Sequence, residues 1–242
     1  MTFLRSAIFF VWFAFISAAL CILCLPLLLG PRRGAGMLGH NWSLLVFWGL
    51  KIIAGTRYEV RGSKPATASL IAVKHMSMWD TCAIYSLLDD PAIVLKRGLL
   101  MIPFYGWYLW KAGMIPIERD GGAGTLRRMV AAAKAQLARG RSVVIFPEGT
   151  RKKVAAPPDY KPGVAGLYGQ LGVPCVPVAL NSGLFWTGFV KNSGTIVIEF
   201  LEPIPPGLPR REFMPRLEAA IEGSTKKLVA EGQNQLERRN ER

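Results

Sequence analysis

The stretch that decides the fold is Val73-Lys74-His75-Met76-Ser77-Met78-Trp79-Asp80-Thr81. It follows the apolar run 70–73, which predicts a buried strand, and it leads into residues 81–88, which predict a helix. In open α/β sheets, ligand-binding and catalytic groups often lie where a strand hands over to a helix. His75 is one of two histidines in the chain, and its place at this junction marks a candidate site.

The spacing of His75 and Asp80 sets a condition on where the helix begins. Five residues on a regular helix correspond to about 140° of rotation, so the two side chains cannot share a helical face. Ser77-x-x-Asp80 is a capping-box pattern, which predicts Ser77 as the N-cap and turns the Asp80 carboxylate toward the entering chain. An Asp80–His75 contact is then expected. The alternative is that Asp80 only caps the helix and His75 is a structural loop residue.

A second polar segment, Phe146-Pro147-Glu148-Gly149-Thr150-Arg151, follows the predicted strand 142–146. If this strand and the strand 70–73 are parallel, both segments open at the same sheet edge. Glycine permits a tight turn, and the planar guanidinium of Arg151 suits a phosphate. Arg119 also ends a predicted strand and is a further candidate. The alternative is a polar turn with a solvated Arg-Lys-Lys face.

The remaining periodicity predicts an α/β domain. Apolar runs predict strands at 57–61, 92–95, 113–117, 175–180 and 195–201, and helical spacing predicts helices at 125–137, 163–171 and 211–236. Pro103 marks an expected helix start in the aromatic segment 101–110, and residues 181–192 are expected to be irregular. We expect an α/β fold with a mixed, largely parallel sheet flanked by helices and an N-terminal membrane-embedded helical segment.

The N-terminal part of the chain predicts membrane attachment. Residues 7–30 carry no charge and correspond to about 36 Å of helix, enough to cross a bilayer core. A cleaved signal peptide is the competing interpretation, but no A-x-A-like site precedes Pro31. Residues 42–54 are too short to span, so a surface helix or the second arm of a hairpin dipped into one leaflet is expected.

We therefore divide the chain into a membrane segment, residues 1–55, and a domain, residues 56–242. More basic residues follow the apolar segment than precede it. The positive-inside rule then places the domain on the cytoplasmic face of the cell (inner) membrane.

Charge restricts the partners. The formal net charge of +14 favours nucleic acid, an anionic membrane surface or anionic substrates. Nucleic acid is not expected, because no basic run is interleaved with exposed aromatics and no zinc or RNP-type signature occurs. The four scattered cysteines suggest neither a disulfide framework nor a metal site. A basic turn, a histidine–aspartate pair and a membrane segment together favour a lipid substrate with a phosphate head.

Four sequence blocks resemble the glycerolipid acyltransferases, specifically the 1-acylglycerol-3-phosphate acyltransferases. In order, the blocks are His-x4-Asp from His75 to Asp80, Ile115-Pro116-Ile117-Glu118-Arg119, Phe146-Pro147-Glu148-Gly149-Thr150-Arg151, and Val176-Pro177-Val178-Ala179-Leu180-Asn181-Ser182-Gly183. The chain departs from the family pattern at three places. Glu118 stands where Asp is usual, Lys74 where asparagine is common, and Gly98 near Lys96 where an acidic residue is common.

The resemblance implies that residues 56–242 are an acyltransferase catalytic domain. Such enzymes transfer an acyl group from acyl-CoA or acyl carrier protein to the 2-hydroxyl of lysophosphatidate, giving phosphatidic acid. His75 is implied as the general base and Asp80 as the group that orients it. The glycerol phosphate is implied to be held by Arg119, Glu148, Gly149, Thr150 and Arg151.

The resemblance also implies that the acyl thioester is a co-substrate and that no resident cofactor or metal is needed. The implied partners are membrane phospholipids, lysophosphatidate, and acyl-CoA or acyl carrier protein. Two alternatives stay open. One is a related acyltransferase for a lyso-ornithine lipid, another lysophospholipid or glycerol 3-phosphate, and the other is a non-catalytic membrane lipid-binding protein. Ser77 and Cys82 are less well supported as covalent nucleophiles, because Ser77 is the expected cap and Cys82 faces into a predicted helix.

Overall fold

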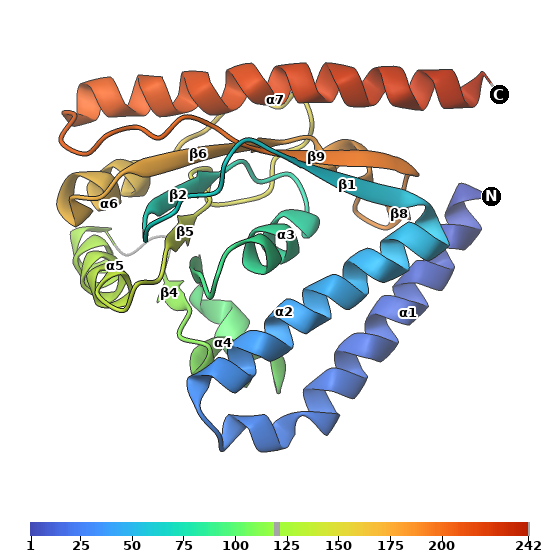
Figure 1. Cartoon of the computed structure of the whole chain (residues 1–242), viewed down its shortest axis with the longest axis horizontal. Coiled ribbons are helices and arrows are strands. Elements are labelled where there is room, and N and C mark those ends of the chain that lie inside the picture. The colour runs from blue at the N-terminus through green and yellow to red at the C-terminus, as the bar shows by residue number, and fades with distance from the viewer. Residues whose placement is uncertain (119–121, 242) are drawn as a thin grey trace.

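The computed structural model describes residues 1–118 and 122–241. Within them, seven strands form one sheet in the order β1-β9-β6-β2-β5-β3-β4 (Figure 1). Of the pairings described within this sheet, only β6–β9 is antiparallel, which confirms the predicted mixed, largely parallel sheet. The strands are β1 (Thr56–Arg61), β2 (Leu70–Val73), β3 (Ala92–Lys96), β4 (Ile115–Ile117), β5 (Val143–Ile145), β6 (Cys175–Leu180) and β9 (Gly194–Phe200).

Helices cover both faces of the sheet. They are α1 (Thr2–Leu23), α2 (Arg32–Gly49), α3 (Trp79–Leu87), α4 (Tyr105–Lys111), α5 (Gly122–Leu137), α6 (Gly163–Leu171) and α7 (Arg210–Asn240). Successive side chains of β2 enter opposite cores, because strand side chains alternate. Ile71 packs in a core with α1 to α4, whereas Leu70 packs in a core with α5, α6 and the first half of α7.

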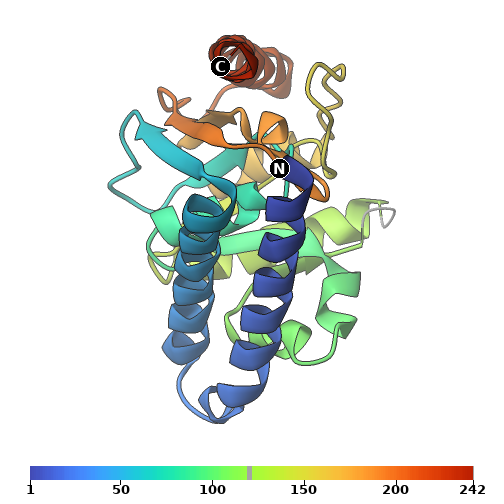
Figure 2. The ribbon, with the colours of Figure 1, turned by 90° about the vertical axis from the view of Figure 1, so that its right-hand side faces the viewer.

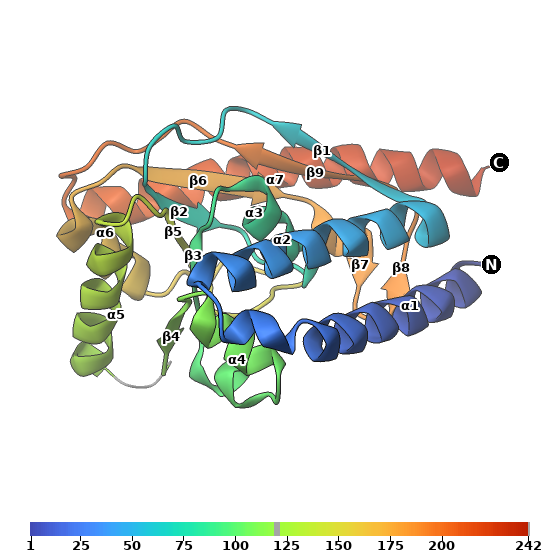
Figure 3. The same cartoon turned by 60° about the horizontal axis from the view of Figure 1, so that its bottom comes forward.

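The first two helices form an antiparallel hairpin, which the views in Figures 2 and 3 show lying side by side. The charge-free segment 7–30 is not one continuous helix, because α1 ends at Leu23 and a short 3-10 helix, η1 (Leu25–Leu28), follows. Pro26 lacks the N–H that would continue the α-helix. The expected start of the second helix at residue 42 is wrong, because α2 already begins at Arg32 and continues into a π-helical turn, η2 (Leu50–Ala54).

Helix α1 is attached to the domain near both of its ends. The backbone N–H of Lys191 donates a 2.9 Å hydrogen bond to Ser6 Oγ, and the Tyr108 hydroxyl donates a 3.1 Å bond to the Cys21 carbonyl. Among the described helices, α1 alone is long and apolar enough to cross a membrane. The two contacts hold α1 against the domain near its beginning and near its end.

The segment 181–192 is more regular than expected. It contains a 3-10 turn, η4 (Ser182–Leu184), and a small antiparallel hairpin of β7 (Trp186–Thr187) and β8 (Val190–Lys191). Gly188 stands in the connecting turn with a φ of +69°, a conformation that glycine adopts without steric cost. The strands are only two residues each, too short for alternation to reveal in the sequence.

A buried arginine joins the turns at the amino-terminal edge of the sheet. The Arg141 guanidinium donates to the backbone carbonyls of the turns that enter β3 and β4, at Asp90, Pro91, Ala112 and Gly113, over 2.8–3.2 Å. Arg32 of α2 adds a bidentate pair with the Asp90 carboxylate at 2.8 and 2.6 Å. Charge therefore ties the helical hairpin to the base of the sheet.

Arg141→Met should lower the free energy of unfolding by about 3–5 kcal/mol, because buried carbonyls would lose their charged donor. Urea unfolding followed by circular dichroism in mild detergent measures the change. Arg139→Met is the matched control, since Arg139 is exposed and should change stability by less than about 0.5 kcal/mol. Equal effects of the two substitutions would show that Arg141 does not hold these turns together.

Candidate active site

The site lies where three neighbouring strands end. β2 lies between β5 and β6 and is parallel to both. The loops that follow them, at residues 74–78, 146–151 and 181–185, therefore leave the same edge of the sheet. This arrangement confirms that the His75 segment and the Arg151 segment lie together.

His75 and Asp80 are in direct contact. His75 Nδ1 lies 3.0 Å from Asp80 Oδ2, and the same oxygen accepts hydrogen bonds from the backbone N–H groups of Met76 at 2.6 Å and Ser77 at 2.8 Å. The Asp80 side chain is fully buried, and hydrogen-bond donors surround its two oxygens. The Nδ1 proton then points to Asp80, and Nε2 keeps a free lone pair. The structural and functional interpretations of Asp80 are thus compatible.

Ser182 is a member of this cluster that the sequence did not identify. Its hydroxyl donates to Asp80 Oδ1, which also accepts a 3.1 Å bond from Ser77 Oγ. Ser182 lies two residues after the end of β6, and β6 is the neighbour of β2. The available signal was a pair of polar residues, Asn181 and Ser182, after a predicted strand within the fourth sequence block.

The predicted cap is shifted by one residue. Helix α3 begins at Trp79, so the N-cap position is Met78 rather than Ser77. Ser77 Oγ accepts from the Trp79 N–H at 3.1 Å instead of from the Asp80 N–H. The return bond from the Ser77 N–H to Asp80 is present, so half of the capping box forms.

Neither alternative nucleophile is activated. The Ser77 hydroxyl is engaged with Asp80, Ser182 and the start of α3. Burial raises the pKa of the Cys82 thiol to about 12, so this group stays protonated at neutral pH.

Phe146 fixes the ring of His75. The two rings stack with their centroids 4.0 Å apart, and the His75 side chain is only 12% exposed. The Lys152 N–H donates a 2.8 Å bond to the His75 carbonyl, which joins the two loops a second time. The imidazole orientation is thus set from both β2 and β5.

The turn 146–151 presents its last residues to the same space. Gly149 has a φ of +65°, and its N–H closes the turn by donating to the Phe146 carbonyl at 2.9 Å. Thr150 and Arg151 are exposed and line the cavity that His75 also lines. No carboxylate in the described part of the chain forms an ion pair with Arg151, whose guanidinium can therefore meet an external anion.

Glu148 does not follow the prediction for a substrate ligand. Its carboxylate is completely buried and accepts a 2.9 Å bond from Lys74 Nζ, which also donates to Glu222 of α7 at 2.7 Å. Tyr160 donates to the same Glu222 oxygen at 2.9 Å. Burial raises the pKa of Glu148, while Lys74 acts in the opposite direction. The Glu148 carboxylate has internal partners and is not free for a phosphate.

The remaining predicted ligand, Arg119, lies outside the described residues. Its neighbour Glu118 forms an exposed ion pair with Arg97 at 2.9 Å. Lys96, which lies next to the departure from the family pattern at Gly98, is exposed and lines the cavity.

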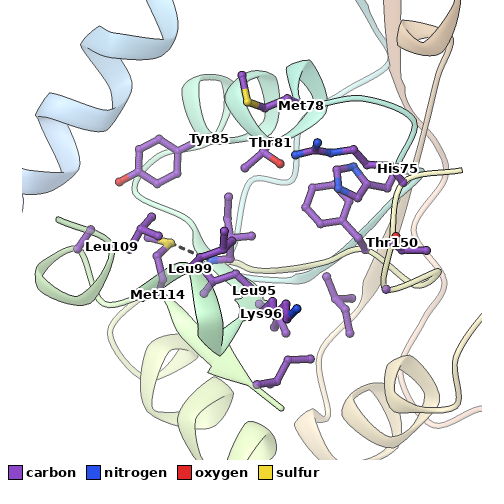
Figure 4. A pocket seen from close by; sticks show the side chains of 18 of the residues that line it. His75, Met78, Thr81, Tyr85, Leu95, Lys96, Leu99, Leu109, Met114 and Thr150 are labelled. Carbon is purple, nitrogen blue, oxygen red and sulfur yellow. Dashed lines mark hydrogen bonds between the residues drawn. The ribbon is translucent and has the colours of Figure 1, made fainter. Parts of the chain in front are cut away.

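A cavity of about 1400 Å³ connects the site to the helical hairpin. Figure 4 shows His75, Thr81, Lys96 and Thr150 around it, together with apolar side chains such as Leu99. Most of its lining is apolar, and the hairpin contributes Phe13, Leu20, Leu38 and Trp42. In the part of the chain that the structure describes, no group of three or more His, Cys, Asp or Glu side chains could hold a metal ion.

Comparison with known proteins places the site in a family. A family model described as Acyltransferase matches residues 57–181. The chain is 36% identical to a 1-acyl-sn-glycerol-3-phosphate acyltransferase of Pseudomonas aeruginosa, over 66% of this chain and 63% of that protein. It is 27% identical to proteins of the same name from Salmonella typhimurium, over 73% of each chain, and 27% identical to the alpha form from Homo sapiens, over 84% of this chain and 72% of that protein.

The fold has a solved counterpart. The crystal structure of PlsC, the 1-acyl-sn-glycerophosphate (LPA) acyltransferase from Thermotoga maritima, superposes with a TM-score of 0.78 and covers 95% of this chain and 98% of that one. At 19% identity this likeness supports the fold alone. The family model matches just over half of the chain, from β1 to the end of β6, and includes both polar segments of the site. The chain therefore belongs to the acyltransferase family.

Proposed function

We propose that this protein transfers a fatty acyl group from an acyl thioester to the 2-hydroxyl of 1-acyl-glycerol 3-phosphate, giving phosphatidic acid. One observation carries the proposal: His75, held by Asp80, and the guanidinium of Arg151, which has no carboxylate partner among the described residues, line one largely apolar cavity. The names of the relatives support the same acceptor. A base, an anion-binding group and room for alkyl chains are what this transfer needs.

The proposed reaction uses His75 as a general base. Nε2 takes the proton of the acceptor hydroxyl while its oxygen attacks the thioester carbonyl. The tetrahedral intermediate collapses as the C–S bond breaks, and the imidazolium returns its proton to the leaving thiolate. Asp80 holds the ring through Nδ1 and stabilises the imidazolium, and it stays ionised throughout. The substrate hydroxyl is itself the nucleophile, so no acyl-enzyme is required.

Thr150, Arg151 and the backbone of Gly149 are proposed to bind the glycerol phosphate. Arginine binds phosphate through two parallel N–H groups, which fixes the orientation of the headgroup as well as its charge. Glu148 is assigned a positioning role, because Lys74 and the His75 N–H hold its two oxygens inside the loop. Arg119 remains a proposed contributor.

The donor is proposed to be acyl-CoA or acyl carrier protein, and no resident cofactor takes part. The cavity exceeds the usual range of about 300–1,000 Å³ for small-molecule pockets, which suits two long-chain substrates. Assays of a panel of lyso-lipid acceptors against both donors identify the true pair. No transfer with lysophosphatidate, but transfer with another acceptor, would overturn the proposed substrate.

We propose that the hairpin α1–α2 lies in one leaflet of the cell (inner) membrane with the domain on its cytoplasmic face. The outer side of the hairpin exposes Phe10, Val11, Phe15 and Leu23 of α1 and Trp48 of α2. An exposed apolar surface of this extent requires a lipid or protein partner. The contacts near both ends of α1 favour the hairpin alternative over a single span.

His75→Ala should lower kcat by about 10²–10⁴-fold, because the acceptor hydroxyl would lose its general base. Purified protein in detergent, assayed with lysophosphatidate and acyl-CoA, gives the rate. His40→Ala is the control, since His40 belongs to α2 and is not part of the cavity lining. A His75→Ala enzyme of near wild-type rate would remove the central claim.

Arg151→Ala should raise the KM for lysophosphatidate by about 10–100-fold, because a charge-assisted bond contributes about 1.5–3 kcal/mol. Arg151→Lys keeps the charge without the paired donors, and its KM should lie between those of the wild type and Arg151→Ala. Lys153→Ala removes an exposed cation of the same loop and should leave KM near wild type. An unchanged KM in Arg151→Ala would place the phosphate elsewhere.

Lys74→Met should destabilise the protein by about 3–5 kcal/mol and raise the KM for lysophosphatidate, because Glu148 would be left buried without its cation. The double variant Lys74→Met/Glu148→Gln should recover part of both losses, since it removes the unpaired charge as well. Chemical unfolding and steady-state kinetics measure the two effects. Additive losses would mean that the pair does not support the loop.

A further inference from the structure

The segment between β3 and β4 carries a second exposed apolar surface, separate from the outer side of the hairpin. A 3-10 helix, η3 (Arg97–Met101), leads into α4. Five large apolar side chains of this segment are exposed, which we call the α4 platform: Met101, Ile102, Phe104, Trp107 and Trp110. Met101 and Trp110 are 80% and 73% exposed. Core packing does not account for side chains this open.

The α4 platform is continuous with the turn of the hairpin. Trp107 and Trp110 line a shallow groove together with Leu28 of η1. Leu27 and Leu29 of the same turn are exposed beside it. Figures 1 and 3 both show α4 next to this end of the hairpin. One apolar surface therefore joins elements about eighty residues apart in the sequence.

We propose that the α4 platform rests in the headgroup region of the same anionic leaflet that holds the hairpin. This inference rests on the proposed membrane attachment. Tryptophan prefers the membrane–water interface, where its ring is apolar and its N–H meets water. Lys96 precedes the platform and Lys111 follows it, so a cation flanks the aromatic side chains at each end, which suits an anionic lipid surface.

The α4 platform also faces the active-site cavity from its inner side. Leu99, Ile102 and Phe104 line the cavity, and Ile102 and Phe104 are at the same time exposed. This short segment therefore lies between the proposed leaflet contact and the cavity. Its position gives a lyso-lipid a direct route from the leaflet to His75 with its acyl chain kept in apolar surroundings.

Tryptophan fluorescence tests the placement. The full-length protein is reconstituted in phosphatidylcholine–phosphatidylglycerol vesicles that contain phosphatidylcholine brominated near the headgroup end of its chains. Trp107→Phe/Trp110→Phe should lose about two thirds of the quenchable emission, because Trp48, Trp107 and Trp110 are the exposed tryptophans of the described chain. Trp48→Phe is the matched variant on the hairpin.

The outcomes separate the two proposals. Loss of quenching in both variants supports the α4 platform as a membrane contact. Loss in Trp48→Phe alone overturns this inference and leaves the membrane attachment standing. If neither variant loses quenching, both the platform contact and the proposed membrane attachment are overturned. A wild-type dimer in light scattering that becomes a monomer in Trp107→Ser/Trp110→Ser would assign the surface to a second copy and also overturn the inference.

A kinetic measurement gives an independent readout. Trp107→Ser/Trp110→Ser should raise the KM for long-chain lysophosphatidate in vesicles by about tenfold, because two aromatic side chains that anchor the platform in the membrane are lost. Its kcat/KM for a short-chain, water-soluble lysophosphatidate should stay unchanged. An equal loss on both substrates would show that the tryptophans support the fold rather than the membrane contact.

Discussion

The carboxylate of Asp80 is the interaction on which the site depends. It accepts hydrogen bonds from the chain leaving β2, from Ser182 after β6 and from the His75 ring. Two loops of different strands thus converge on one buried negative charge. A buried carboxylate is costly unless donors surround it, so the same bonds that lower this cost also define the imidazole orientation. Stability and catalysis place the same demand on this residue.

Buried charge also organises the two edges of the sheet differently. At the amino-terminal edge, Arg141 binds backbone carbonyls and closes the base of the domain. At the carboxyl edge, Lys74 binds Glu148 and Glu222, which links the turn 146–151 to the long helix α7. The Arg141 guanidinium is occupied by these backbone carbonyls and by Gln136. At the second edge, the Glu148 carboxylate is paired with Lys74, whereas no carboxylate of the described residues pairs with Arg151.

Local and apolar features were predictable from the sequence, and long-range polar pairs were not. The bounds of β2, α6 and β6 agree with prediction, because elements buried on both sides or on a clear stripe give strong periodicity. The His75–Asp80 contact followed from spacing, since both residues belong to one turn. Ser182 and the partners of Glu148 come from distant strands and helices, and no local pattern reports their contacts. Hydropathy alone does not locate the break after α1, because it measures the polarity of a segment and not the point at which the chain changes direction.

The helical hairpin explains why fold and membrane cannot be treated separately in this chain. Its inner side, with Phe13 and Trp42, closes the cavity over His75, while its outer side exposes Phe15 and Trp48. A helix apolar on all sides is stable only when both sides are covered. The domain covers one side, and water is a poor cover for the other. In the proposed membrane attachment, lipid on the outer side would stabilise the wall of the cavity, and the leaflet that delivers the proposed substrate would also complete the site that binds it.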